Sequence, residues 1–167
     1  MWGSITPDTN NVCSWENAPF NNGSSSFDSS YFNSVKDTVC PNRILAKEYD
    51  AASQIMAGDW RMPTQTEWQE LLDNTTNEWI ADYNGTGVNG RKFTSKTDTS
   101  KYIFIPAAGS NVYGAANGVG RSGYVCSSSL NTSYSDSIWV LNFNSGDCSM
   151  FSGAARYYGV SVRGVFK

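Results

Sequence analysis

The spacing of apolar residues changes along the chain, from a helical period in the first half to an alternating one in the second. Over residues 43–57 ("RILAKEYDAASQIMA") apolar residues recur at every third or fourth position, which predicts a helix that Gly58 would end. A second helix is predicted within "PTQTEWQELLDN" (63–74), where Thr64 and Glu67 have the spacing of a capping box. The apolar face of this second helix would consist of Trp68, Leu71 and Leu72.

From residue 85 onward the pattern predicts strands. A strand is predicted in "KYIFIPAAG" (101–109), a hairpin with its turn at "NSGD" in "SIWVLNFNSGDCSM" (137–150), and a final alternating strand in "GVSVRGVF" (159–166). Two Asn-Gly pairs in "NGTGVNG" (84–90) predict turns. Helices followed by a run of antiparallel strands predict an α+β domain.

The first forty residues have the composition of a loop. Within them, "NNGSSSFDSSYFNS" (21–34) is so rich in Asn, Ser and Gly that only its aromatic side chains could hold it to a core. Those aromatic anchors are Phe20, Phe27, Tyr31 and Phe32. The sequence contains no tandem repeat and no linker, so we expect residues 1–167 to form a single domain.

Composition narrows the class of protein. The chain is 40% hydrophobic and 14% aromatic, which is typical of a globular domain, yet only 16% of its residues are charged. Ser, Asn, Gly and Thr supply the remaining polarity, a balance common in secreted, surface-displayed and virion proteins. The net charge is −3 and no Lys/Arg cluster occurs, so we expect no nucleic-acid partner. No apolar run approaches the ~18 residues of a membrane-spanning helix, so we expect no membrane insertion.

The residue types also limit the possible chemistry. The chain has 0 His, which removes histidine bases, histidine metal ligands and the Ser-His and Cys-His nucleophile pairs. Its 4 Cys form no C-x-x-C motif, so a zinc or thioredoxin-type site is not expected. The cysteines have two equally good interpretations. They form two local disulfides, Cys13–Cys40 and Cys126–Cys148, or they are four free buried thiols. We expect no cofactor and no metal.

No catalytic constellation emerges from the other motifs. Glu67 belongs to the capping box, so its neighbours Asp59 and Glu70 form no evident acid–base pair with it. The Gly-rich stretch 114–123 lacks both the Lys-Ser/Thr of a phosphate-binding loop and the pattern of a dinucleotide site. Arg156 and Arg163 could contact an anionic ligand, but bonding of their guanidinium groups to backbone carbonyls is the favoured interpretation. We therefore expect a protein that is not an enzyme.

Six stretches occur in the order of one known family. They are "GDWRMPTQTEWQELLDN", "FTSK", "YIFIPAAG", "GYVCSSS", "LNFNSG" and "RYYGVSVRGV". In this order they resemble the Fibrobacter succinogenes major paralogous domain, which is abundant in Bacteroidetes proteins, and the resemblance runs from Trp2 to Val165. It implies a C-type-lectin-like fold, related to that of formylglycine-generating enzymes, with two helices, a mixed antiparallel sheet and long loops.

The sequence departs from the family pattern in two places. Family members usually carry an opening strand before "WG", so the resemblance implies that another segment or chain completes the sheet, or that the protein is a homo-oligomer. The family often has Tyr-Trp-Ser-Ser-Ser where this chain has Val125, Cys126 and 127–129. The replacement of a family Trp by Cys126 favours the Cys126–Cys148 disulfide.

Some members of this family are the variable proteins of diversity-generating retroelements, in which template Asn codons become any codon ending in C or T. The stretch 124–167 resembles such a variable region. Its fixed scaffold would include Met150 and Trp139, because an Asn codon reaches neither Met nor Trp, and Arg156 also resembles a fixed position. The implied ligand-binding positions are Tyr134, Asp136, Ile138, Val140, Phe151, Ser152, Gly153, Ala154, Ala155, Tyr157, Tyr158 and Val160.

Randomised positions should lie on a surface, because randomising a core would leave cavities or unpaired polar groups. We expect Trp139, Leu141 and Phe143 to alternate on the strand face that supports this surface, with Val140 and Asn142 on the opposite face. Tyr157 and Tyr158 are stiff, amphipathic side chains of the kind that recognition surfaces favour.

The resemblance implies a hypervariable receptor-binding protein or adhesin. It would be extracellular, displayed on a phage particle or on a bacterial surface structure such as a pilus tip, and would bind a cell-surface protein or glycan. An invariant surface paralogue of the same fold is the alternative. An enzyme related to formylglycine-generating enzymes is the weaker third possibility, since it rests on fold analogy alone.

Overall fold

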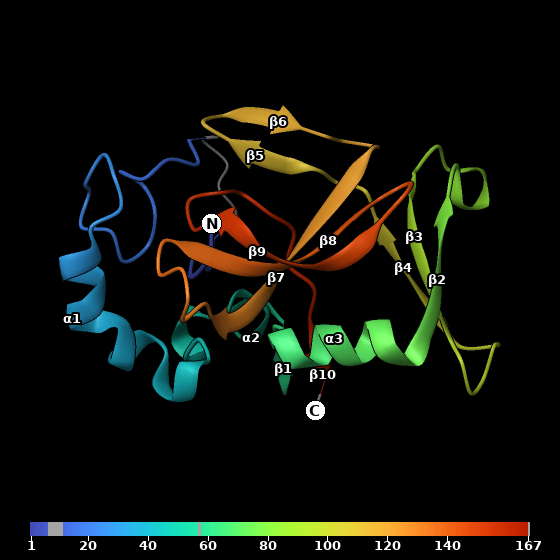
Figure 1. Ribbon diagram of the computed structural model, residues 1–167, viewed down its shortest axis with the longest axis horizontal. Coiled ribbons are helices and arrows are strands. Elements are labelled where there is room, and N and C mark those ends of the chain that lie inside the picture. Colours follow the sequence, from blue (N-terminus) through green and yellow to red (C-terminus); the bar gives the residue numbers. More distant parts are fainter. Residues whose placement is uncertain (7–11, 57, 167) are drawn as a thin grey trace.

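A computed structural model describes residues 1–6, 12–56 and 58–166 of the chain. The helices in these ranges are α1 (Ser29–Val39), α2 (Ala51–Ile55) and α3 (Gln65–Asn74), with 3₁₀ turns at Pro41–Arg43, Lys47–Tyr49 and Tyr83–Gly85. α1 and the β2–β3–β4 sheet lie at opposite ends of the longest axis, with the β7–β8–β9 sheet between them (Figure 1). The class is α+β, as the sequence predicted.

Four small sheets carry the described strands, and every ladder among them is antiparallel. The central sheet consists of β7 (Ser122–Leu130), β8 (Ser137–Asn144) and β9 (Cys148–Ala155). A second three-stranded sheet consists of β2 (Thr75–Ile80), β3 (Gly90–Ser95) and β4 (Tyr102–Pro106). The two-stranded sheets are β5 (Ser110–Val112) with β6 (Ala115–Asn117), and β1 (Trp60–Arg61) with β10 (Val165–Phe166).

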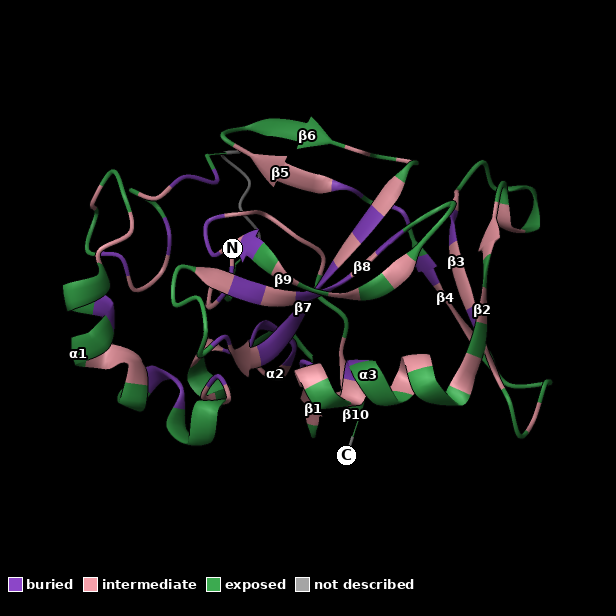
Figure 2. Ribbon diagram, viewed as in Figure 1, coloured by how far each residue is buried: buried purple, intermediate pink, exposed green. Residues whose placement is uncertain are grey.

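The central sheet contributes buried residues to two apolar clusters, one on each face, and Figure 2 marks the buried positions along its strands. Because successive side chains of a strand point to opposite faces, Cys126 and Val140 enter one apolar cluster whereas Val125 and Leu141 enter another. The first cluster also contains Trp2, Phe32, Leu45, Ala51, Ala52 and Met62. The second contains Trp68, Phe93, Ile105, Ala107 and Phe143. Contact between Phe143 and β7 is so close that a Cβ at Gly123 would lie 2.1 Å from the Phe143 ring.

Local signals predicted several elements correctly. Thr64 caps α3, and the reciprocal bonds with Glu67 complete the expected capping box. The β8–β9 hairpin turns at residues 144–147, with a hydrogen bond from the Asn144 N–H to the Asp147 carbonyl. β4 lies within the predicted strand region 101–109 and ends at Pro106. Of the two Asn-Gly pairs, the one at 84–85 has the positive φ angles of a turn, 53° and 71°, whereas the other opens β3.

The helix predicted over 43–57 is wrong for most of its length. Only Ala51–Ile55 is α-helical, and Ala57 lies outside the described residues. Ile44 and Leu45 are extended instead, because Ile44 pairs with Ser129 and the Leu45 N–H donates to the Ser128 carbonyl. The apolar residues here therefore pack along β7 rather than on one helical face.

The loop expected within the first forty residues contains α1. The Asp28 side chain accepts from the Tyr31 N–H and begins the helix, and Phe32 and Val39 bury its inner face. Tyr31 was expected to anchor this segment, but it is exposed, so that expectation is wrong. Ser- and Asn-rich sequence has a weak intrinsic preference for helix, and packing of two apolar side chains overrides it here.

The final strand is also shorter than the alternation predicted, since β10 contains only Val165–Phe166. Before it, Gly159 pairs with Asn111 of β5 and Ser161 pairs with Val125 of β7 through isolated bridges. The segment crosses from one sheet to another, so no single partner strand extends its ladder.

Candidate ligand-binding surface

The expectation of surface positions is wrong for four of the predicted ligand-binding positions, which are buried: Ile138, Val140, Ala154 and Tyr157. Ile138, Val140 and Ala154 are 1%, 0% and 2% exposed and pack together in the first apolar cluster. The face of β8 that was expected to be free is covered by the N-terminal segment, α1 and α2. Side chains at these positions therefore support the surface from beneath.

The exposed predicted positions lie on two neighbouring segments. Tyr134 and Asp136 are exposed on the loop between β7 and β8, and Phe151 and Gly153 are exposed on β9. The Arg156 N–H donates to the Asp136 carbonyl, so the end of this loop lies directly beside the end of β9. Ser152, Ala155, Tyr158 and Val160 are half-buried.

Asn131 joins these two segments. Its side-chain amide N–H donates to the Ser152 carbonyl at 2.9 Å, and its side-chain oxygen accepts from the N–H groups of Ser133 and Tyr134. Asn131 is 1% exposed, so water cannot readily replace these bonds. No local sequence pattern indicated this role of Asn131.

The position of the Phe151 ring depends on Gly153. A Cβ at Gly153 would lie 2.6 Å from the end of the Phe151 ring, so only glycine leaves room for this ring position. Phe151 is nevertheless 45% exposed, since its ring covers the β9 backbone without entering either apolar cluster. The ring is therefore available to a ligand.

Aromatic side chains form a second feature next to this surface, which we call the tyrosine cluster: Trp15, Tyr113, Tyr157 and Tyr158. The Tyr157 ring lies 4.9 Å from Trp15 and 5.0 Å from each of the other two tyrosines. Tyr157 is buried by them, and burial followed by hydrogen bonding to Tyr113 raises the pKa of its hydroxyl. Tyr113, in contrast, is 62% exposed.

Two members of the tyrosine cluster come from outside the predicted variable region. Tyr113 occupies the tight turn between β5 and β6 with a φ of 50°, and its N–H donates to the Cys13 carbonyl. This placement could not be predicted from the sequence, because Trp15 and Tyr113 lie far from Tyr157 along the chain. No local pattern marks either residue. The tertiary structure brings all three together.

Arg156 is buried among aromatic rings. Its side chain is 2% exposed, and its guanidinium carbon lies 3.6 Å from the Phe32 ring centroid, 4.6 Å from that of Trp2 and 6.0 Å from that of Phe27. None of its guanidinium nitrogens has a hydrogen-bond partner among the described residues, so the predicted bonding to backbone carbonyls is wrong. Burial lowers the pKa of Arg156 to about 10. Arg163 is exposed.

Of the two interpretations of the cysteines, the one with two disulfides is wrong, because neither disulfide is formed. Cys40, Cys126 and Cys148 are free thiols, which rules out both Cys13–Cys40 and Cys126–Cys148 in this structure. Burial raises the pKa of Cys40 and Cys126 to about 12 and that of Cys148 to about 11. These thiols are therefore protonated at neutral pH and are poor nucleophiles.

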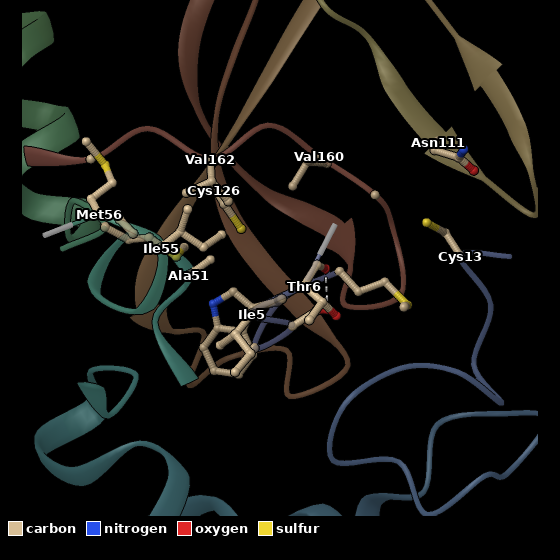
Figure 3. A pocket seen from close by; sticks show the side chains of 18 residues that line it. Ile5, Thr6, Cys13, Ala51, Ile55, Met56, Asn111, Cys126, Val160 and Val162 are labelled. Carbon is tan, nitrogen blue, oxygen red and sulfur yellow. Dashed lines mark hydrogen bonds between the residues drawn. The ribbon is translucent and has the colours of Figure 1, made fainter. Parts of the chain in front are cut away.

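An apolar pocket of about 410 Å³ opens beside the C-terminal segment (Figure 3). Trp2, Ile55, Met56, Val160 and Val162 contribute to its lining, with Cys126 at its base. Val160, predicted as a variable surface position, thus lines this pocket and not the exposed surface described above.

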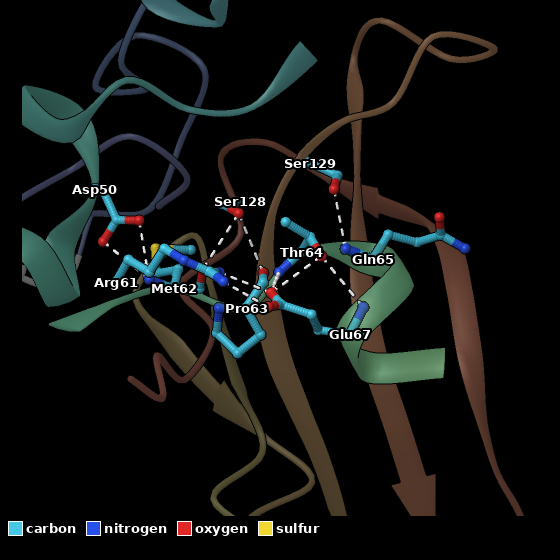
Figure 4. A network of polar contacts seen from close by, with 9 residues as sticks. All are labelled: Asp50, Arg61, Met62, Pro63, Thr64, Gln65, Glu67, Ser128 and Ser129. Atoms are coloured by element: carbon cyan, nitrogen blue, oxygen red, sulfur yellow. Dashed lines mark hydrogen bonds and ion pairs between the residues drawn. The ribbon is translucent and has the colours of Figure 1, made fainter. Parts of the chain in front are cut away.

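Two carboxylates serve the fold (Figure 4), and one of them, Glu67, was considered above as a catalytic candidate. Glu67 accepts from Arg61 and from the Thr64 N–H, and hydrogen bonding to Arg61 is the main cause that lowers its pKa to about 2. Asp50 accepts from the N–H groups of Ser53 and Met62. Within the described ranges, no group of three or more His, Cys, Asp or Glu side chains has the arrangement of a metal site.

Comparisons with protein-family models, with curated proteins and with solved structures gave no match to this chain. None of the helices in the described ranges has the length and apolar composition that crossing a bilayer requires.

Proposed function

We propose that this chain is a ligand-binding domain of C-type-lectin-like fold, diversified by a retroelement at exposed positions. The motif order seen in the sequence supports this proposal, and the α+β architecture is compatible with it. In this role the domain would be a receptor-binding protein or adhesin, displayed outside the cell on a phage particle or a bacterial surface.

One observation carries the proposal: exposed predicted positions from two segments lie side by side over a core that is packed on both faces. Tyr134 and Asp136 adjoin the β9 positions Phe151 to Gly153 through Asn131 and the Asp136–Arg156 backbone bond. Substitution at the exposed positions removes no buried contact, so the frame tolerates many side chains there.

The structure reduces the number of positions that can contact a ligand. Ile138, Val140 and Ala154 are enclosed, so polar or bulky residues at them would cost several kcal/mol of stability. We propose that the ligand contacts are Tyr134, Asp136, Phe151, Ser152, Gly153, Ala155 and Tyr158, with Tyr113 added from the tyrosine cluster.

The ligand class that fits this surface is a cell-surface protein or glycan. Exposed aromatic rings next to a carboxylate offer flat apolar contact together with hydrogen bonding, which both kinds of ligand use. We propose no cofactor, no nucleic-acid partner and no enzymatic activity, in keeping with the protonated thiols and the structural use of Glu67.

Binding to intact bacterial cells tests this proposal. The Phe151→Ala and Tyr158→Ala variants should each lose more than about 1 kcal/mol of binding free energy if these rings are hot spots. Tyr102→Ala is the matched control, because Tyr102 is 49% exposed on β4 at the far end of the molecule. Equal binding by all three variants would contradict the assigned surface.

The genome tests diversification separately. A retroelement would leave a near-identical, Asn-rich copy of the coding segment for 124–167 next to a reverse transcriptase gene. Absence of such a copy from a complete genome would leave the invariant surface paralogue as the better proposal.

A further inference from the structure

On one side, the C-terminal segment 159–164 has no backbone hydrogen-bond partner among the described residues. Gly159 exchanges two backbone hydrogen bonds with Asn111, at 2.7 and 2.9 Å. Ser161 donates its N–H to the Tyr124 carbonyl at 3.0 Å and accepts from the Cys126 N–H at 2.9 Å. Residues 159 and 161 therefore direct both of their backbone polar groups to the β5 and β7 side.

In extended backbone, the polar groups of alternate residues point to opposite sides. Those of Val160 and Val162 consequently point away from β5 and β7, and no hydrogen bond joins them to another described residue. An unpaired edge of this kind is a template on which a further strand can form.

The apolar pocket lies beside this edge. Figure 3 shows Ile55, Met56, Val160 and Val162 around the same space, with the Cys126 side chain between them. Ile55 is 63% and Val162 46% exposed, which is unusual for large aliphatic side chains that already share one hollow. None of the described lining residues carries a charged side chain.

We propose that this groove binds an extended apolar segment of another polypeptide, which adds as a strand along Val160–Val162. Its backbone would pair with the N–H and C=O groups of these two residues, which have no partner in the described part of the chain, and alternate apolar side chains would enter the pocket. No described lining residue has a charged side chain, so a charged side chain entering among Ile55, Val160 and Val162 would be desolvated at a cost. A small apolar molecule would fill the pocket but leave the edge unpaired.

This proposal does not depend on diversification or on the exposed surface of Tyr134 and Phe151. It gives the domain a second interface, suited to attachment to a carrier protein while the first interface remains open to a ligand. Backbone pairing provides affinity in this binding mode, and the apolar side chains determine specificity.

The test uses the full chain and a short blocked peptide in which Val and Thr alternate, with terminal Lys for solubility. Amide hydrogen exchange is measured by NMR as the peptide is added. We expect exchange at the Val160 and Val162 N–H groups to slow by at least about tenfold at saturation, whereas Tyr134, on the exposed surface, does not change.

Two controls separate strand addition from apolar contact alone. The same peptide with alternate backbone nitrogens methylated keeps its side chains but loses its donors, and should bind at least about tenfold more weakly. Val162→Pro removes the N–H and should also weaken binding, whereas Val162→Thr keeps the backbone and the shape and should bind as the native chain does.

Three results would overturn the proposal. They are failure of the peptide to bind, unchanged exchange at Val160 and Val162 in the saturated complex, and equal binding of the methylated peptide. Protection of these amides without peptide, rising with protein concentration, would assign the groove to a second copy of this chain and would also overturn it.

Discussion

Replacing Arg156 tests what holds the end of β9 in place. Its guanidinium group is buried against Phe32 and Trp2 without a hydrogen bond to another described residue, while its backbone bonds Asp136 and Trp2. A side-chain substitution therefore changes the aromatic contacts and leaves the backbone bonds in place. Three variants separate charge from volume: Arg156→Met keeps most of the volume, Arg156→Lys keeps the charge, and Arg156→Ala keeps neither.

Two opposing contributions set the expected magnitudes. Burial lowers the pKa of Arg156 from 12.5 to about 10, which corresponds to a penalty of about 3 kcal/mol on the charged form. Each desolvated cation–π contact contributes about 2 kcal/mol, and the contacts with Phe32 and Trp2 are close enough to count. The net contribution of the charge is therefore only about 1 kcal/mol, much less than that of the buried volume.

We expect Arg156→Met to change the free energy of unfolding by less than about 1.5 kcal/mol, because an apolar side chain of similar size replaces a barely compensated charge. Arg156→Ala should lose about 3 kcal/mol or more through the cavity it leaves. Arg156→Lys should be worse than Arg156→Met, because an ammonium is more strongly hydrated and cannot stack on a ring.

Urea unfolding followed by tryptophan fluorescence measures these differences, in a reducing buffer because the chain carries free thiols. Arg163→Met is the matched control, since Arg163 is exposed and its loss should change stability by less than about 0.5 kcal/mol. If Arg156→Met proved as unstable as Arg156→Ala, the guanidinium charge would dominate, and the near balance derived above would be wrong.

Three further predictions concern the frame. The carboxylate of Glu67 has its pKa lowered from 4.5 to about 2, so its contribution to stability is present above pH 4.5 and is lost as the pH falls toward 2. Urea unfolding measured against pH should show a loss of about 1–2 kcal/mol over this range, and Glu67→Gln should abolish that loss. If Glu67→Gln kept the same pH profile as the native chain, this prediction would be wrong. Asn131→Ala should lower stability by about 1–3 kcal/mol in thermal unfolding, and amide exchange in the loop should not become slower. Increased protection of the Tyr134 amide would contradict the assigned role. Gly123→Ala should cost about 1–3 kcal/mol because the ring it meets is buried, but Gly153→Ala less than about 0.5 kcal/mol because its ring can move into solvent; equal losses would refute this distinction.

Local sequence determined the elements whose signals lie within a few residues. The capping box at Thr64 and Glu67 fixes the start of α3, and the "NSGD" turn joins β8 to β9, because each needs only bonds between near neighbours. Pro106 ends β4 for the same reason. The α+β class follows from the order of these elements.

Helix 43–57 and α1 show where local signals fail. The apolar spacing near Ile44 resembles a helical face, but bridges to Ser129 and Ser128 hold this stretch extended. Ser29–Val39 has little helical preference of its own and becomes helical because Phe32 and Val39 are buried. In both segments, contacts with distant parts of the chain outweigh a preference worth only tenths of a kcal/mol per residue.

The candidate surface was predictable only in part. The family resemblance predicted Tyr134, Phe151 and Tyr158 as positions for recognition, and the structure leaves them accessible or half-buried. It could not show that Ile138 and Val140 lie in the core, because alternation along a strand does not reveal whether one face or both are covered.

What the sequence determined by itself was the capped start of α3, the turn between β8 and β9 and the α+β class, together with the absence of histidine chemistry. Only the tertiary structure decided that Arg156 stacks on Trp2 and Phe32, that Tyr113 joins Tyr157, and that Val160 lines a groove. Turns and caps depend on bonds between neighbours in sequence, whereas burial and aromatic contacts depend on which distant segments pack together, and no short stretch of sequence contains that information.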